Sequence, residues 1–151
     1  MRGRVLQWVL RSLDGAADAL PWRRRRLGAR HLRTGRRGED DAYFWLRRQG
    51  YVMVARNWRS PRRRGELDLV GWEKQVLCFI EVKTRSRRDL VTAEAAVDLS
   101  KQKELRAMAA EYLRRLPGAA PPHRFDVVTV YYEEAGRPAI TLLRDAFRVA
   151  G

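Results

Sequence analysis

Cysteine and histidine are almost absent from this chain of 151 residues, which contains one cysteine and two histidines. Cys78 cannot form an internal disulfide, which favours a reducing compartment, so we expect a cytoplasmic protein with this thiol buried in a strand. His31 and His123 lie far apart in the sequence, so a zinc site with the usual thiolate and imidazole spacing is excluded. Any bound metal ion must therefore be held by oxygen atoms.

Long apolar segments are also missing. No apolar run approaches the ~20 residues that a helix needs to span a bilayer. The apolar stretch near the N-terminus is short, is interrupted by Gln7 and ends before Arg11. We therefore expect neither a signal peptide nor a membrane span.

Acidic residues are outnumbered by basic ones, with 18 Asp and Glu against 32 Lys and Arg, which gives a net charge of +14. Such an excess attracts polyanions, either nucleic acid or an acidic membrane surface. Much of it lies in residues 1–37, which hold 11 arginines and 2 aspartates. We call residues 1–34 the arginine-rich arm. Two interpretations stay open for it, a nucleic-acid-binding element with a short helix or a solvated tail.

Residues 35–151 are long enough for one domain, and their apolar residues repeat with helical or strand periodicity. Helices are expected at 38–49 and 100–116, and strands at 51–58, 66–72, 76–85, 124–132 and 138–143. Ser100 is a suitable N-cap for the second helix, and Pro117 with Gly118 is suited to end it. The order αβββαββ predicts an α/β fold with a mixed central sheet flanked by helices.

Two carboxylates lie inside the predicted hairpin of strands 66–72 and 76–85. Side chains two residues apart share a face of a strand, so Glu81 and Lys83 point the same way. If the position numbers of facing residues add up to an odd value such as 147 or 149, Asp68 lies beside Glu81. Adjacent buried carboxylates repel and need a cation, and Mg²⁺ prefers oxygen ligands. The alternative is a structural ion pair with Lys83 and nearby arginines.

The helix at 38–49 contributes a third carboxylate. Glu39 lies three, four and seven residues before Ala42, Tyr43 and Leu46, so it shares their inward face, whereas Asp40 does not. An acidic residue near a helix start can also act on the helix dipole alone. We expect the metal site where the hairpin meets this first helix.

An acidic strand followed by a strand ending in Glu-x-Lys resembles the PD-(D/E)xK motif of the restriction-endonuclease-like nucleases, with Leu67 and Asp68 in place of Pro and Asp. Over residues 35–148 the chain is similar to the YraN family of bacterial proteins, whose fold resembles that of Holliday-junction-resolvase-like enzymes. The matching blocks are GRRGEDDAYFWLRRQGYVMVARNWRS, RGELDLV, FIEVKTR, KQKELRAMAAEYL, HRFDVV and LLRDAF.

This resemblance implies a nuclease-like domain at 35–151 that binds Mg²⁺, with Mn²⁺ as a substitute. It implies that Asp68 and Glu81 are metal ligands, that Lys83 is the catalytic lysine, and that Glu39 is a further acid of the site. Lys101 or Gln102 matches a position of a further polar site residue. The residues expected to contact nucleic acid are Arg62, Arg63, Arg64, Arg85, Arg87, Arg88, Lys101 and Gln102.

The function favoured by the sequence is a Mg²⁺-dependent endonuclease acting on branched or structured DNA, with DNA preferred to RNA. One alternative is a non-catalytic nucleic-acid-binding module of the same fold, acting as an accessory factor in DNA recombination, repair or uptake. Another is a basic protein associated with RNA or a membrane surface, in which the carboxylates are structural. Cutting both strands of a junction would require a homodimer, and the sequence leaves the oligomeric state open.

Overall fold

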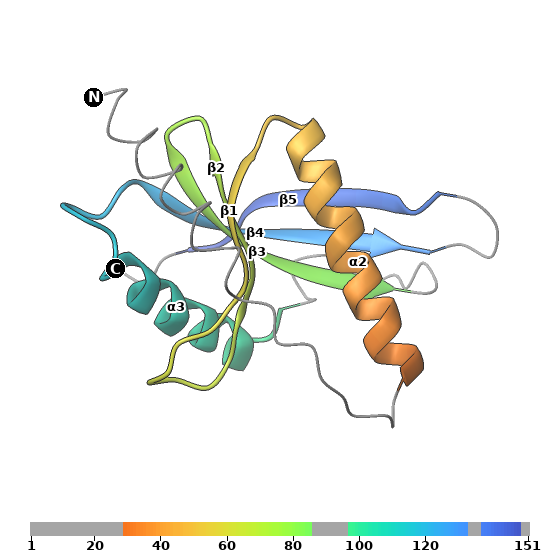
Figure 1. Cartoon of the computed structure of the whole chain (residues 1–151), viewed down its shortest axis with the longest axis horizontal. Helices are drawn as coiled ribbons and strands as arrows, with labels where there is room; N and C mark the ends of the chain where they lie inside the picture. Colours follow the sequence, from red (N-terminus) through yellow and green to blue (C-terminus); the bar gives the residue numbers. More distant parts are fainter. Residues whose placement is uncertain (1–28, 86–96, 133–136, 149–151) are drawn as a thin grey trace.

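The computed structural model describes residues 29–85, 97–132 and 137–148, which form two helices and one five-stranded sheet (Figure 1). The strands follow their sequence order across the sheet, with β3 and β4 parallel and the other neighbours antiparallel. This confirms the predicted α/β class and the order αβββαββ, and it is consistent with a restriction-endonuclease-like fold. The elements are α2 (Ala29–Arg48), β1 (Val52–Trp58), β2 (Leu67–Glu73), β3 (Val76–Arg85), α3 (Leu99–Leu113), β4 (His123–Tyr131) and β5 (Ala139–Phe147).

Helix α2 begins at Ala29, well before the predicted start at Gly38 and within the arginine-rich arm. Gly38 is not a helix boundary. It is buried, and a Cβ atom at this position would collide with the side chain of Thr84, so the missing side chain lets α2 lie close to β3. Residues 1–28 lie outside the described part of the chain, and the division between arm and domain stays a prediction.

The prediction that Ser100 caps the second helix is wrong. The N-cap of α3 is Asp98, whose Oδ1 accepts a hydrogen bond of 2.8 Å from the backbone amide of Lys101. A carboxylate at this position also interacts favourably with the helix dipole. The helix ends at Leu113, shortly before the predicted end, and Arg114 is its C-cap.

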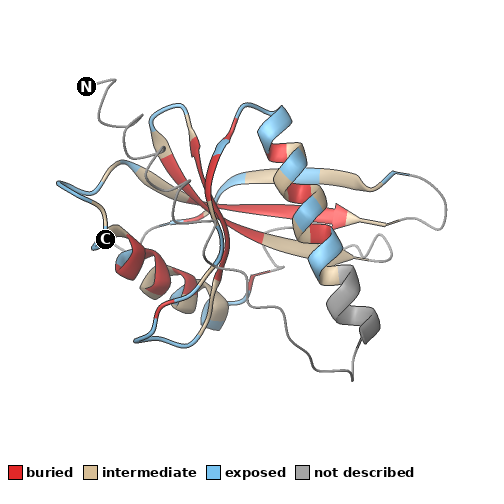
Figure 2. Cartoon of the chain, in the orientation of Figure 1, coloured by how far each residue is buried: buried red, intermediate tan, exposed pale blue. Residues whose placement is uncertain are grey.

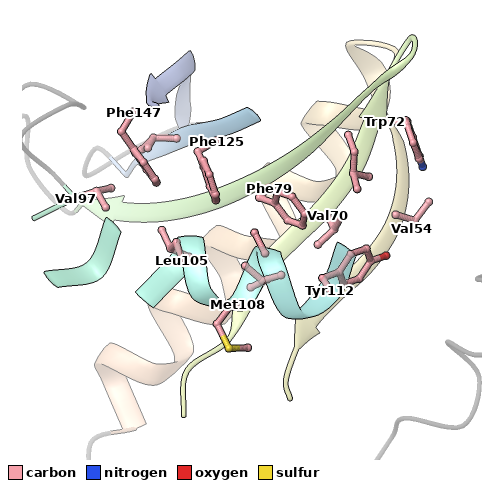
Figure 3. Packing of buried hydrophobic residues seen from close by; sticks show 14 residues of the cluster. Val54, Val70, Trp72, Phe79, Val97, Leu105, Met108, Tyr112, Phe125 and Phe147 are labelled. Carbon is pink, nitrogen blue, oxygen red and sulfur yellow. The ribbon is translucent and has the colours of Figure 1, made fainter. Parts of the chain in front are cut away.

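The two faces of the sheet carry separate hydrophobic clusters. Buried residues lie along the strands and on both flanking helices (Figure 2). On one face Ala42 and Leu46 of α2 pack over β-strand residues that include Ile80. On the other face Met108 and Tyr112 of α3 pack over strand residues that include Phe79 (Figure 3). Because strand side chains alternate, Glu81 shares the α3 face with Phe79.

Strand β5 extends to Phe147, several residues beyond the predicted end at 143. The ring of Phe147 stacks on that of Phe125, with centroids 4.7 Å apart, and this packing holds the last part of β5 against the sheet. Within the described ranges, neither helix is long and apolar enough to cross a membrane.

Candidate active site

Asp68 and Glu81 are brought together by the register of the β2–β3 hairpin. Val70 pairs with Phe79 and Leu69 with Ile80, so the same register places Asp68 opposite Glu81. The position numbers add up to 149, an odd value, which is the condition under which the sequence places the two carboxylates side by side. The backbone amide of Val82, the residue after Glu81, donates a hydrogen bond of 2.8 Å to Oδ2 of Asp68.

The two carboxylates repel one another in a largely buried position, with only 8% of Asp68 and 5% of Glu81 exposed. Burial raises the pKa of Asp68 to about 7, and the negative charge of Glu81 contributes to this shift. The amide of Val82 and the charge of Lys101 oppose the shift but do not cancel it. Near neutral pH the pair therefore favours binding either a proton or a cation.

Two lysines approach Glu81 from different elements. Lys83, two residues along β3, donates from Nζ to Oε1 of Glu81 at 2.9 Å. Lys101, in the first turn of α3, has its Nζ 3.7 Å from Oε2 of Glu81 and 3.0 Å from Oε1 of Glu104. Burial disfavours the charge on Lys101, but Glu81 and Glu104 outweigh this effect and raise its pKa. The site thus contains a second lysine besides the one in the Glu-x-Lys pattern.

Glu39 lies on α2 and is held by β1. Its Oε2 accepts a hydrogen bond of 2.7 Å from Nδ2 of Asn57. Burial raises the pKa of Glu39 despite that hydrogen bond, and its negative charge also raises the pKa of Asp68. Its neighbour Asp40 forms an exposed ion pair with Arg56, as expected for a side chain outside the inward face.

The acid pair lies on the sheet face that α3 covers, and not on the face of the first helix as we expected. Lys101 of α3 contacts Glu81, whereas Ala42 and Leu46 of α2 pack on the opposite face. Asp126 also lies on the α2 face, where it is fully buried and paired with Arg124 at 2.8 Å. Asp126 is therefore a structural ion-pair partner outside the acid pair.

The donor set of the site fits a hard divalent cation. Mg²⁺ usually takes one or two carboxylates and completes its coordination with water or phosphate oxygens. Oε2 of Glu81 is buried and has no hydrogen bond within the described part of the chain. In the same part, no three His, Cys, Asp or Glu side chains are grouped to hold a metal ion. Asp68 and Glu81 as metal ligands, and Glu39 as a third, stay predictions.

The residues of this site lie in the part of the chain that matches a known protein family. The family described as Uncharacterised protein family UPF0102 matches residues 38–130, more than half of the chain. The chain belongs to the UPF0102 family. This match confirms the resemblance to the YraN family, which is the same group of proteins, and it includes both carboxylates of the pair as well as Lys83 and Lys101.

Individual UPF0102 proteins are similar over most of their length. A UPF0102 protein of Koribacter versatilis (strain Ellin345) is 54% identical over 121 residues, covering 80% of this chain and 83% of its own. One from Solibacter usitatus (strain Ellin6076) is 46% identical over 132 residues, covering 87% and 95%. One from Symbiobacterium thermophilum is 44% identical over 115 residues, covering 76% and 96%.

The structure describes some, but not all, of the arginines that were expected to bind nucleic acid. Arg62, Arg63 and Arg64 are exposed on the β1–β2 loop, and with α3 they line a groove of about 420 Å³ that also includes Lys103. Arg85 is half-buried at the end of β3. The predictions for Arg87 and Arg88 lie outside the described residues. We call the hollow between this loop and α3 the arginine groove.

The structure separates the roles of the two polar residues at the start of α3. Gln102 donates from Nε2 to the carbonyl oxygen of Val97 at 3.0 Å, and its Oε1 accepts from Arg106. These bonds tie Gln102 to the helix start. Lys101 is the one whose charged group reaches the acid pair.

Two residues of the site escaped the sequence analysis. Glu104 pairs with Lys101 three positions earlier, a helical spacing that the sequence already contains. Asn57, the hydrogen-bond donor to Glu39, has a positive φ of 46° within β1. Asparagine tolerates this left-handed conformation better than most residues, so an asparagine late in a strand was the available signal.

Proposed function

We propose that this protein is a Mg²⁺-dependent endonuclease that hydrolyses phosphodiester bonds in branched or structured DNA. The observation that carries the proposal is the buried, adjacent pair of Asp68 and Glu81 with the Lys83 ammonium 2.9 Å from Glu81. Two carboxylates and a lysine in this arrangement suit metal-assisted hydrolysis, because they combine a cation site with a fixed positive charge.

The carboxylates and the lysine would have different roles in the hydrolysis. Asp68 and Glu81 would hold Mg²⁺, which when bound supplies Lewis acidity and neutralises charge on the phosphate. Asp68 must lose its proton to act as a ligand, and its raised pKa of about 7 makes this a step near neutral pH. Lys83 would orient the attacking water or stabilise the negative charge that develops on the phosphate oxygens.

The arginine groove is the proposed contact for the DNA backbone. Three consecutive exposed arginines and Lys103 of α3 line it. Glu104 also lines the groove and accepts a hydrogen bond from Lys101, whose Nζ is 3.7 Å from Glu81, so the groove lies next to the acid pair. Phosphates bound in the groove would bring a neighbouring phosphodiester toward the carboxylates.

Replacing Arg63 and Arg64 with alanine should weaken DNA binding and reduce its salt dependence. Each lost phosphate contact lowers the slope of log K against log salt by about 0.9 for duplex DNA, so we expect a decrease of roughly 2. The matched control is alanine at Arg47 and Arg48, which are exposed at the end of α2 and remove the same charge. Fluorescence anisotropy at several salt concentrations measures both. Equal slopes for the two double variants would show that the groove is not a specific contact.

The decisive experiment is a cleavage screen with single-stranded, duplex, flapped and four-way DNA, together with matched RNA. We expect cleavage of a branched DNA in Mg²⁺ and in Mn²⁺, none with a chelator, and none by the Asp68→Asn variant. Cleavage that survives in Asp68→Asn would come from a different site or from a contaminant. Cleavage of RNA alone would contradict the proposed substrate.

One observation favours a second candidate, a nucleic-acid-binding module without catalysis. Lys83 and Lys101 both lie beside Glu81, so the chain already neutralises part of the acid pair. In that case the carboxylates would serve as a structural ion-pair network below the arginine groove. Tight binding of branched DNA with no cleavage in the screen would support this candidate.

A further inference from the structure

We propose that Lys101 is the built-in counterion of the acid pair and that Glu104 positions it to withdraw when a divalent cation binds to Asp68 and Glu81. This inference rests on the proposed metal site. It assigns a role to Glu104 and explains how the same buried carboxylates are compensated before and after an ion binds.

The first observation is the position of the Lys101 ammonium between two carboxylates. Its Nζ lies 3.0 Å from Oε1 of Glu104, a hydrogen-bond distance, but 3.7 Å from Oε2 of Glu81. The Glu81 oxygen is buried and accepts no hydrogen bond within the described residues. The attraction between Lys101 and Glu81 is therefore electrostatic, without a hydrogen bond that would have to break.

The second observation is that the β1–β2 loop lies beside Glu104 at Gly65. Gly65 has a φ of +110°, and a Cβ atom built on it would lie 2.6 Å from Oε1 of Glu104. The positive φ favours glycine, so no side chain separates the loop backbone from the carboxylate here. The loop backbone thus lies against the same Glu104 oxygen that accepts from Lys101, on the side of the helix that carries Lys101.

The two lysines of the site are not equivalent. Lys83 donates directly to Oε1 of Glu81 from the same strand. Lys101 comes from α3, faces the open oxygen, and already has its hydrogen bond to Glu104. A divalent cation at the acid pair would repel both ammonium groups, and Lys101 can move away from Glu81 while keeping that hydrogen bond. Lys101 is therefore the charge that exchanges with the ion.

A double-mutant cycle on metal binding tests this arrangement. Isothermal titration calorimetry with Mn²⁺ compares wild type with Lys101→Met, Glu104→Gln and the double variant. The Lys103→Met variant is the control, because Lys103 is exposed on the same helix and removes the same charge. Titration at about pH 8.5 keeps competition from protons on the carboxylates small.

We expect Lys101→Met to bind Mn²⁺ roughly tenfold more tightly, because the competing charge is gone, an effect of about 1.4 kcal/mol. Glu104→Gln should bind it several-fold more weakly, because Lys101 then has only Glu81 as a charged partner. The double variant should behave like Lys101→Met, since Glu104 acts through Lys101. Lys103→Met should change the affinity by less than about twofold, as a screened surface charge does.

Strictly additive effects in the double variant would overturn the proposal, because they would reflect only the summed charges around the site. An equal gain in affinity for Lys103→Met would overturn it for the same reason. The metal-free proteins provide an independent measurement: Lys101→Met should melt several degrees below Lys103→Met, because the buried Glu81 loses a half-buried counterion. If wild type binds no Mn²⁺, the proposed function and the exchange fail together. A lower melting temperature for Lys101→Met would then still support the counterion role, and equal melting temperatures would overturn it.

Discussion

Replacing Lys83 with methionine is expected to lower the rate of DNA cleavage by about 10²–10³, the usual effect of removing one electrostatic stabiliser from a preorganised site. The ammonium is 2.9 Å from Oε1 of Glu81, where it can act on the attacking water or on charge in the transition state. It contributes only one of 32 basic side chains to DNA attraction. Affinity for the preferred DNA should therefore stay within a few-fold of wild type.

Single-turnover cleavage and equilibrium binding on the same DNA separate the two effects. The control is again Lys103→Met, which removes an exposed lysine that lines the arginine groove and leaves Glu81 untouched. This control should lose some affinity and keep most of its rate at saturating enzyme. A Lys83→Met enzyme that keeps most of the wild-type rate would show that the active site lies elsewhere in the molecule.

Replacing Asp68 with asparagine should abolish metal binding and stabilise the metal-free protein above neutral pH. Mg²⁺ that binds only the folded state raises the melting temperature of wild type, and this rise should vanish in the variant. Without metal, we expect the variant to be more stable by about 1–2 kcal/mol at pH 8, because it relieves a buried like-charge pair. The asparagine side-chain oxygen can still accept the hydrogen bond from the Val82 amide that Asp68 accepts at 2.8 Å.

The pH dependence of this difference follows from the raised pKa of Asp68. Its folded-state pKa of about 7 lies above the usual value of 3.8 because of burial first and then the charge of Glu81. The protonated form therefore stabilises the fold at low pH, and this contribution is lost as the pH rises through about 7. Glu39 increases the effect, whereas Lys101 opposes it.

Thermal melts of wild type and Asp68→Asn between pH 5 and pH 8 measure this. The stability advantage of the variant should be small at the acidic end and grow toward the alkaline end. For wild type, the rise in melting temperature with Mg²⁺ should likewise appear mainly above about pH 7, when the ligand is deprotonated. A constant difference between the two proteins over this range would contradict a raised pKa at Asp68.

The part of the site that sequence could predict depends on local periodicity. Side chains alternate along a strand, and the short turn from β2 into β3 fixes which residues face each other. These two facts place Asp68 beside Glu81 only when the turn has an even number of residues, a condition that the structure meets, and the Glu-x-Lys spacing placed Lys83 on the same face. Helical spacing likewise put Glu39 on the same side as Ala42 and Leu46, which are fully buried.

Other features depend on contacts between segments distant in sequence, and no local pattern contained them. Gly38 resembled a helix start, but it allows α2 to lie close to Thr84 of β3, so the helix continues through it. Helix α3 covers the acid pair because it packs on the sheet face that carries Asp68 and Glu81. The ion pair of Lys101 with Glu81 exists because the chain brings α3 over β3, whereas the pair of Lys101 with Glu104 lies within α3. Periodicity assigns a side chain to a face of its own element, but packing between elements determines which charges meet there.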